Sequence, residues 1–306
     1  MKIENQYYEG ERPLFAQHDS RIVNTTFGTG ESPLKEGRNL ELSGDIFQWK
    51  YPLWYCRKVT ADHMVFEEMS RSGIWYTHDI SLTDSSIQAP KEFRRCSGIT
   101  LKNDHFSNAA ETLWNCDDIH MTDVQINGDY FGMNSTNIYA ERLNVIGNYV
   151  FDGAKNVEVH DSTFVSKDAF WNCENVVIYD SVIDGEYLAW NTKNLTLINC
   201  TIESEQGLCY VEHLTLRNCK LLHTNLAFEY CSDIDADVRS RIDSVKNPES
   251  GVITADGIDD IIMDPTAIDP MKTHIVCRDR GSGNTVADSD AIATGATALG
   301  KEKAHV

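Results

Sequence analysis

The feature that most constrains this chain is an internal repeat of 19 to 21 residues, mostly 19, that runs through most of its 306 residues. When the sequence is cut before each x-(Asn/Asp)-apolar triplet, consecutive segments align, from RNLELSGDIFQWKYPLWYC at residue 38 to EHLTLRNCKLLHTNLAFEYC at residue 212. A weaker copy starts at His18 and a decaying one at Ser232. Such regularity predicts an architecture that grows by adding units along one axis.

Three columns of apolar residues run through these copies, at the third, fifth and tenth positions. In the copy that starts at Glu174 they are Val176, Ile178 and Ile183. Positions three and five share one face of a strand, because side chains alternate with a period of two, and position four between them is mostly polar. Stacking the copies as parallel strands buries all three columns. The sequence therefore predicts an all-β fold, a right-handed parallel β-helix solenoid of about 11 to 12 coils.

The second position of most copies is Asn or Asp, as at Asn39, Asp79 and Asn156. These residues tolerate a left-handed backbone and cap tight bends, so this column is expected to mark a corner. Two other repeat architectures fit less well. A leucine-rich repeat alternates strand with helix, whereas these copies show no helical period, and a β-propeller needs about 40 residues per blade.

The repeat also divides the chain. We expect an N-terminal cap at residues 1–17, the β-helix at 18–250 and a C-terminal cap at 251–278, since the two end segments leave the repeat. Residues 279–306 contain no aromatic residue and are rich in Gly, Ala, Ser and Thr, so a disordered tail is expected there.

Charge and composition narrow the function classes. A net charge of −20 argues against a nucleic-acid or anionic-membrane partner, because both need a basic surface. The N-terminus shows no apolar signal segment, and no stretch approaches the length of a membrane span, so a cytoplasmic location is expected. The nine cysteines contain no C-x-x-C pair and are expected to be free thiols, most of them small core residues. We expect no metal site and no cofactor, since no ligand spacing or nucleotide-binding motif is present.

The ends of the copies are unusual, reading PLWYC, GIWYT, EFRRC, TLWNC, FGMNS, VFDGA, AFWNC and LAWNT. One column of them mixes tryptophans with Arg94 and Asp152, which a dry core would not accept, so this edge is expected to line a groove or a partly wet corner. Aromatic faces stack on sugar rings, while charged groups bond sugar hydroxyls. The candidate substrate-binding residues are Trp54, Trp75, Arg94, Trp114, Trp171, Trp190, Tyr130 and Glu186.

Paired carboxylates could act as general acid and base in glycoside hydrolysis. The candidates are Asp152, Asp168, Glu111 and Asp129, with Glu186 beside them. A lyase would need a base next to cations, for which Arg71, Lys91, Arg94 and Arg95 are available. Two hypotheses stay open at this stage: a protein that binds or cleaves an oligosaccharide, or a non-catalytic scaffold whose tryptophans form a packed ladder or a protein-binding or oligomer surface. Whether the chain is an enzyme is left undecided.

Several long strings resemble a known family. They include SGIWYT, APKEFRRC, NAAETLWNC, GDYFGMNS, SKDAFWNC and QGLCYVEHLTLRNCKLL. From about Glu9 to Cys277 the chain resembles the bacterial family of unknown function DUF3737. The resemblance implies a right-handed parallel β-helix of the pectin-lyase-like class. It implies no activity and no catalytic residues.

Overall fold

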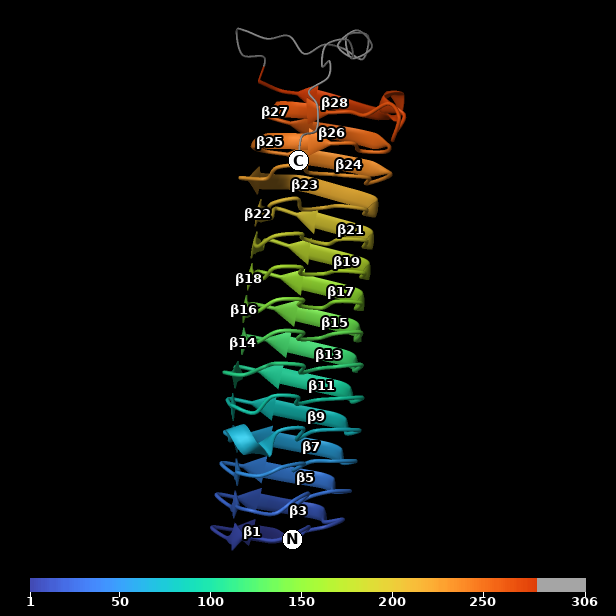
Figure 1. The fold of residues 1–306 in the computed structure, drawn as a ribbon. Coiled ribbons are helices and arrows are strands. Elements are labelled where there is room, and N and C mark those ends of the chain that lie inside the picture. The colour runs from blue at the N-terminus through green and yellow to red at the C-terminus, as the bar shows by residue number, and fades with distance from the viewer. Residues whose placement is uncertain (280–306) are drawn as a thin grey trace, which may run out of the picture.

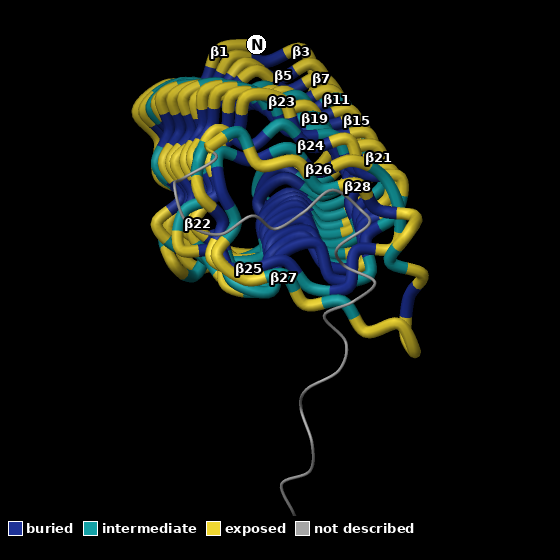
Figure 2. Tube along the Cα trace, turned by 90° about the horizontal axis from the view of Figure 1, so that it is seen from above, coloured by how far each residue is buried: buried dark blue, intermediate teal, exposed yellow. Residues whose placement is uncertain are grey.

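The computed structural model describes residues 1–279, which form one parallel β-solenoid of about 15 turns (Figure 1). Each turn contributes a strand to a long sheet, here called sheet A, and most turns contribute a shorter strand to a second sheet, sheet B. A third side without continuous strands returns the chain to sheet A. Viewed down the axis, buried residues fill the centre and exposed residues form the rim (Figure 2). The predicted all-β parallel solenoid is confirmed.

The strands of sheet A are β1 (Lys2–Glu4), β3 (His18–Val23), β5 (Arg38–Ser43), β7 (Arg57–Asp62), β9 (His78–Thr83), β11 (Ser97–Lys102), β13 (Asp117–Thr122), β15 (Thr136–Glu141), β17 (Lys155–His160), β19 (Glu174–Tyr179), β21 (Lys193–Ile198), β23 (Glu212–Leu222), β24 (Ile234–Val238), β26 (Gly251–Ala255) and β28 (Thr273–Cys277). Those of sheet B are β2 (Tyr7–Tyr8), β4 (Thr26–Phe27), β6 (Ile46–Phe47), β8 (Val65–Phe66), β10 (Ser86–Ile87), β12 (His105–Phe106), β14 (Gln125–Asn127), β16 (Asn144–Ile146), β18 (Thr163–Val165), β20 (Val182–Asp184) and β22 (Thr201–Glu203), followed by the second half of β23. The remaining elements are the paired strands β25 (Arg241–Lys246) and β27 (Gly257–Ile262) and two 3₁₀ helices, η1 (Glu68–Ser70) and η2 (Pro270–Lys272).

The register of sheet A places equal repeat positions on top of one another. Val159 pairs with Ile178, and Ile178 pairs with Leu197, all at the fifth position. Every member of the three predicted apolar columns between residues 38 and 231 is buried, with 3% exposure or less. In sheet B the tenth-position rings of Phe27 and Phe47 stack with their centroids 5.0 Å apart. The three-column core is therefore confirmed, as is the burial of most cysteines.

The Asn/Asp column turns a corner, as expected. Asn39 and Asn156 have φ angles of 52° and 55°, in the left-handed region that asparagine tolerates. Their side chains also form a ladder: Asn156 donates to Asn137 (2.9 Å), Asn175 to Asn156 (3.0 Å) and Asn194 to Asn175 (2.8 Å). Each amide serves as donor to one turn and acceptor from the next, which an aspartate column could not do.

The solenoid extends further toward both ends than the repeat does. Residues 1–17 contain β1, which pairs with β3 in parallel so that Ile3 lies beside Ile22. Residues 251–278 contain β26 and β28, which continue sheet A. These segments are turns of the solenoid, and they account for the excess over the 11 to 12 coils predicted. A disordered tail was expected at residues 279–306, and residues 280–306 lie outside the described part of the chain.

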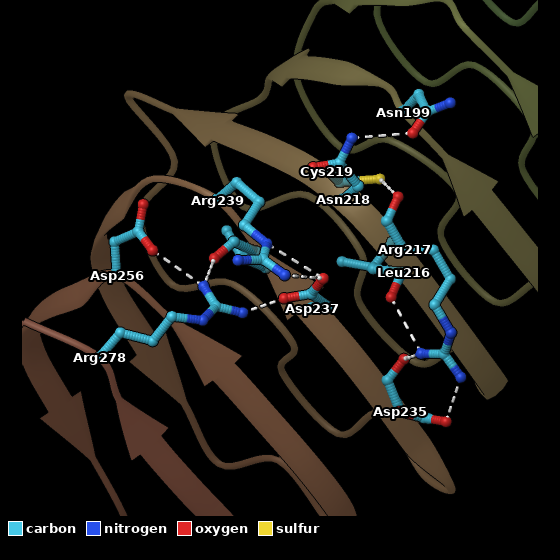
Figure 3. Close-up of polar contacts among 11 residues, drawn as sticks. Asn199, Leu216, Arg217, Asn218, Cys219, Asp235, Asp237, Arg239, Asp256 and Arg278 are labelled. Atoms are coloured by element: carbon cyan, nitrogen blue, oxygen red, sulfur yellow. Dashed lines mark hydrogen bonds and ion pairs between the residues drawn. The ribbon is translucent and has the colours of Figure 1, made fainter.

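Arg278 ties the last turns together (Figure 3). Its guanidinium donates to the Val238 carbonyl (2.7 Å) and to Asp256 (2.9 Å), and it also contacts the carboxylate of Asp237. Arg239 approaches the same Asp237 carboxylate at 3.1 Å. Arg278 thereby joins residues up to 41 positions apart in the chain and three successive turns.

Replacing Arg278 with methionine is expected to loosen β28, because charge-assisted hydrogen bonds contribute about 1.5–3 kcal/mol each. Amide hydrogen exchange in β26 and β28 should accelerate, while exchange in β17 should not change. Arg241→Met is the matched control, since its ion pair with Asp259 is 58% and 57% exposed and joins only neighbouring strands. Equal effects of the two substitutions on β28 would contradict this role for Arg278.

Candidate functional site

The third side of the coils carries the aromatic residues singled out by sequence. We call it the Trp face, and define it by the residues five, two and one positions before the last residue of each coil between residues 38 and 231, where the coils end at Cys56, Thr77, Cys96 and their equivalents. Its backbone alternates through left-handed residues, for example Tyr149, Phe151 and Gly153 with φ of 58°, 61° and 70°. As a result side chains point inward in pairs, as Val150 and Phe151 do, and then outward in pairs.

The residues two positions before the end of each coil form a ladder along the Trp face. Its members are Trp54, Trp75, Arg94, Trp114, Met133, Asp152, Trp171 and Trp190, all of them partly exposed. Trp54 and Trp75 stack almost parallel, with centroids 5.2 Å apart and planes 6° apart. Three indole N–H groups donate to main-chain carbonyls of the following coil: Trp54 to Ser72 (2.6 Å), Trp75 to Lys91 (2.9 Å) and Trp171 to Tyr187 (2.8 Å). These three rings are therefore held in place without a ligand.

Arg94 fits this column by replacing a ring. Its guanidinium lies 4.7 Å from the ring centre of Trp75 and 4.4 Å from that of Trp114, so it is sandwiched between two indoles. Glu111 pairs with both Arg94 (3.2 Å) and Lys91 (3.1 Å). The presence of Arg94 among tryptophans thus reflects cation–π stacking between coils, and a wet groove is not needed to explain it.

The ladder is interrupted between Trp114 and Trp171, where Met133 and Asp152 occupy the column. We call this region, residues 128–173 of the Trp face, the ladder break. Three coils separate the two tryptophans, a distance of about 14 Å at the usual strand spacing. Beside the break, Tyr130 and Tyr149 stack with centroids 4.8 Å apart and planes 4° apart. Tyr149 also presents its edge to Trp171 at 5.8 Å. Beyond the break, the ladder resumes through Trp190 and Tyr210 (5.2 Å).

The outward-facing candidate acids already have partners. Asp129 accepts a hydrogen bond from the Asn148 main-chain N–H (2.7 Å), and Asp152 accepts one from the Asn172 side chain (3.0 Å). Glu186 forms an ion pair with Lys167 at 3.1 Å. Like Glu111, each of these three carboxylates therefore has a hydrogen-bond or ion-pair partner on at least one oxygen.

Asp168 differs from the other candidates. It belongs to the same side, yet its residue is only 1% exposed, and its Oδ1 atom has no hydrogen-bond partner in the described part of the chain. Burial raises the pKa of this carboxyl above its usual value. Its charge in turn raises the pKa of Tyr149, whose hydroxyl lies against it. The structure therefore brings Asp152, Asp168, Tyr149 and Trp171 together at the ladder break, while Trp54, Trp75, Arg94 and Glu111 lie several coils away.

Glu92, two residues before Arg94, was not among the candidates from the sequence. It is fully buried, and neither carboxylate oxygen has a hydrogen-bond partner among residues 1–279. Burial raises the pKa of Glu92 well above its usual range. The residue that makes room for it is Gly73: a Cβ there would lie 2.3 Å from Oε2 of Glu92. A glycine one coil before a buried acid was the available signal.

Two features on the outer face of sheet A were also not predicted from the sequence. His120, Tyr139, His160 and Tyr179 form a ladder of rings across successive strands, in which His120 and Tyr139 hold the fourth repeat position and His160 and Tyr179 the sixth. Next to it lies an open hollow of about 420 Å³ over Thr60, Ser81 and Thr100. Small side chains at these three fourth positions leave that space.

Two features of the described residues bear on other classes of function. Among residues 1–279 no three His, Cys, Asp or Glu side chains converge as they would around a metal ion. The same part of the chain contains no helix with the length and apolar character needed to cross a membrane.

Comparison with known proteins identifies the family. A family model described as "Protein of unknown function (DUF3737)" matches residues 1–276. The chain belongs to this family. The resemblance seen in the sequence is thereby confirmed, and the DUF3737 match covers every coil that carries the Trp face. A search of curated proteins found no match to this DUF3737 chain.

Solved structures similar to this DUF3737 chain include three β-solenoid proteins. The tailspike of E. coli bacteriophage HK620, in complex with a hexasaccharide, is 8% identical over 86% of this chain and 68% of its own, with a TM-score of 0.47. The Streptococcus pneumoniae surface adhesin PfbA is 12% identical over 69% of each chain, with a TM-score of 0.39. The A-module of the Azotobacter vinelandii mannuronan C-5 epimerase AlgE4 is 11% identical over 94% of this chain and 90% of its own, with a TM-score of 0.32. At these identities and TM-scores the neighbours say nothing about what this chain binds.

Proposed function

We propose that this DUF3737 chain binds a carbohydrate chain along its Trp face. The observation that carries the proposal is the array of partly exposed rings along this face, seven of which are at Trp54, Trp75, Trp114, Tyr130, Tyr149, Trp171 and Trp190. Such rings offer apolar surfaces and edges to sugar C–H groups, and the carboxylates and amides among them can bond hydroxyls. Trp54, Trp75 and Trp171 are already held by main-chain carbonyls, and Tyr130 and Tyr149 by stacking on each other, so these side chains lose little entropy on binding.

The geometry favours binding over cleavage. Glycoside hydrolysis needs one carboxyl that gives up a proton and a second that is free to attack or to activate water. Glu111 is held between two cations, and Asp129 and Asp152 each accept a hydrogen bond from the neighbouring coil. Asp168 has a raised pKa, as a general acid requires, but its carboxyl is covered. We therefore propose a binding protein, with an oligosaccharide as partner.

A non-catalytic scaffold is the second candidate function, and the stacked part of the ladder favours it. Trp54 and Trp75 cover each other's faces, and Arg94 covers the faces of Trp75 and Trp114 that point toward it. A surface of ring edges suits a protein partner or a second copy as well as it suits a sugar. The ligand decides between the two candidate functions: a sugar supports the first, and a protein or a second copy of the chain supports the second.

A glycan array read with wild-type protein and with Trp171→Ala tests the proposal. We expect wild type to bind at least one class of glycan and Trp171→Ala to lose affinity for it about tenfold, or about 1.4 kcal/mol, since an aromatic contact is lost. Tyr179→Ala is the matched control, because Tyr179 stacks on His160 (4.5 Å) on the outer face of sheet A, away from the Trp face. A reducing-sugar assay should show no product.

Absence of binding across a broad array would sink the carbohydrate proposal and leave the scaffold. Equal losses in Trp171→Ala and Tyr179→Ala would place the binding surface elsewhere or reveal a general loss of structure. Circular dichroism melting curves of both variants distinguish those two outcomes.

A further inference from the structure

The ladder break is acidic as well as aromatic. Between residues 128 and 192 the third side of the coils carries four carboxylates, at Asp129, Asp152, Asp168 and Glu186, against one ammonium, at Lys167. That ammonium is already paired with Glu186 at 3.1 Å. Three carboxylates are therefore left without a cation of their own, on a chain whose net charge is −20.

In the first half of the ladder, the column contains a cation as well as rings, and a carboxylate neutralises that cation. There Arg94 supplies a cation between two indoles, and Glu111 supplies the matching carboxylate. At the break, Asp152 stands at the repeat position that Arg94 occupies three coils earlier. Rings and carboxylates are thus repeated in the second half. Its one ammonium, Lys167, lies over the ring of Tyr187 at 5.0 Å, and between residues 128 and 173 the ladder column itself holds no cation.

Asp168 provides a second, independent indication of a missing partner. Its Oδ1 atom is buried and accepts no hydrogen bond from residues 1–279. The carboxyl lies against the hydroxyl of Tyr149, whose ring meets Trp171 edge-on at 5.8 Å. Its negative charge therefore sits beneath an aromatic pair, where it makes the ring surface more attractive to a cation without contacting that cation directly.

We propose that the ladder break binds an oligosaccharide of amino sugars whose amino groups are free and protonated. The inference rests on the proposed function, that the Trp face binds carbohydrate, and adds the class of sugar. In this arrangement the C–H face of a sugar ring packs on Tyr130, Tyr149 or Trp171, and its ammonium group lies near Asp152 and above Asp168. N-acetylation removes the ammonium charge, and uronic acid sugars would be repelled by the surrounding carboxylates.

Isothermal titration calorimetry with glucosamine oligomers and N-acetylglucosamine oligomers of equal length tests this inference. The titrations use the full chain at a pH just below neutral, which keeps a share of the sugar amines charged without approaching the raised pKa of Asp168 more than necessary. We expect the free-amine oligomer to bind about tenfold more tightly than the acetylated one, and added salt to reduce that difference. Asp152→Asn and Asp168→Asn should each weaken binding of the free-amine oligomer about fivefold or more and leave the acetylated oligomer unaffected.

Glu158→Gln is the matched control, since it removes one carboxylate from the outer face of β17, far from the Trp face. Spermine serves as a cation that is not a sugar. Equal affinity for both oligomers would overturn the amino-sugar inference and keep carbohydrate binding. Binding of neither oligomer would overturn the amino-sugar inference alone, because the broad glycan array decides separately whether the Trp face binds carbohydrate. Two further outcomes would also overturn the inference, because they would show that binding is only charge attraction. One is an equal loss of affinity in Glu158→Gln and Asp152→Asn. The other is tight binding of spermine without binding of the free-amine oligomer.

Discussion

Replacing Ile178 with aspartate is expected to unfold the central turns of the solenoid. Ile178 is fully buried between Val159 and Leu197 of the adjacent strands, so a carboxylate there would have only apolar neighbours in its column. Burying an unpaired charge costs several kcal/mol, a large part of the roughly 5–15 kcal/mol that stabilises a typical domain. Because each turn contacts only its neighbours, the damage interrupts the stack between two otherwise intact halves.

Urea unfolding followed by circular dichroism measures this effect. The matched control is Val177→Asp, because Val177 lies one position earlier in β19, faces outward and pairs with Glu158 and Thr196. The control should lose less than about 1 kcal/mol, through like-charge repulsion with Glu158. An Ile178→Asp variant with a wild-type midpoint, or a reversed order of the two variants, would mean that the register of sheet A is shifted by one residue.

The core could be predicted because two independent periods agree. Alternation with a period of two assigns Val176 and Ile178 to one face and Val177 to the other, and the 19-residue repeat puts Leu195 and Leu197 directly beside them. The end turns were missed for a physical reason. Parallel pairing depends on main-chain hydrogen bonds, which β1 and β28 make even though their sequences have lost the Asn-apolar triplet.

The candidate site was predicted only in outline. The repeat places Trp54, Trp114 and Trp171 on one side of the coils, and this holds. The repeat does not predict whether each side chain points inward or outward, because that depends on the alternating left-handed backbone of the third side. For that reason Asp152, which faces outward, and Asp168, which is covered, were indistinguishable as candidates. Glu92 was missed because a carboxylate is expected at the surface by default.

Removing the buried carboxyl of Glu92 is expected to stabilise the protein. Glu92→Leu should raise the free energy of unfolding at neutral pH by about 1–3 kcal/mol, because it replaces an unpaired buried polar group by an apolar one of similar size. Burial holds the pKa of Glu92 well above its usual range, so the carboxyl keeps its proton in the folded state and loses it on unfolding. The folded state then binds more protons, and the contribution of Glu92 to stability falls as pH rises above about 4.3, the usual glutamate value.

Urea midpoints between pH 5 and pH 8 separate these two effects. Burial also raises the pKa of Asp45 to about 6 and that of Asp104 to about 7, so wild type and every Glu92 variant share that part of the pH dependence. The difference between Glu92→Gln and wild type should therefore grow with pH, because glutamine keeps the shape and removes only the ionisation. Glu92→Leu should add a gain that does not depend on pH. Glu111→Gln is the control of opposite sign, since it breaks the ion pairs with Lys91 and Arg94 and should destabilise. A Glu92→Leu variant that is destabilised at every pH would show that Glu92 is ionised and paired in the folded protein, and that the Trp face rests on a buried charge.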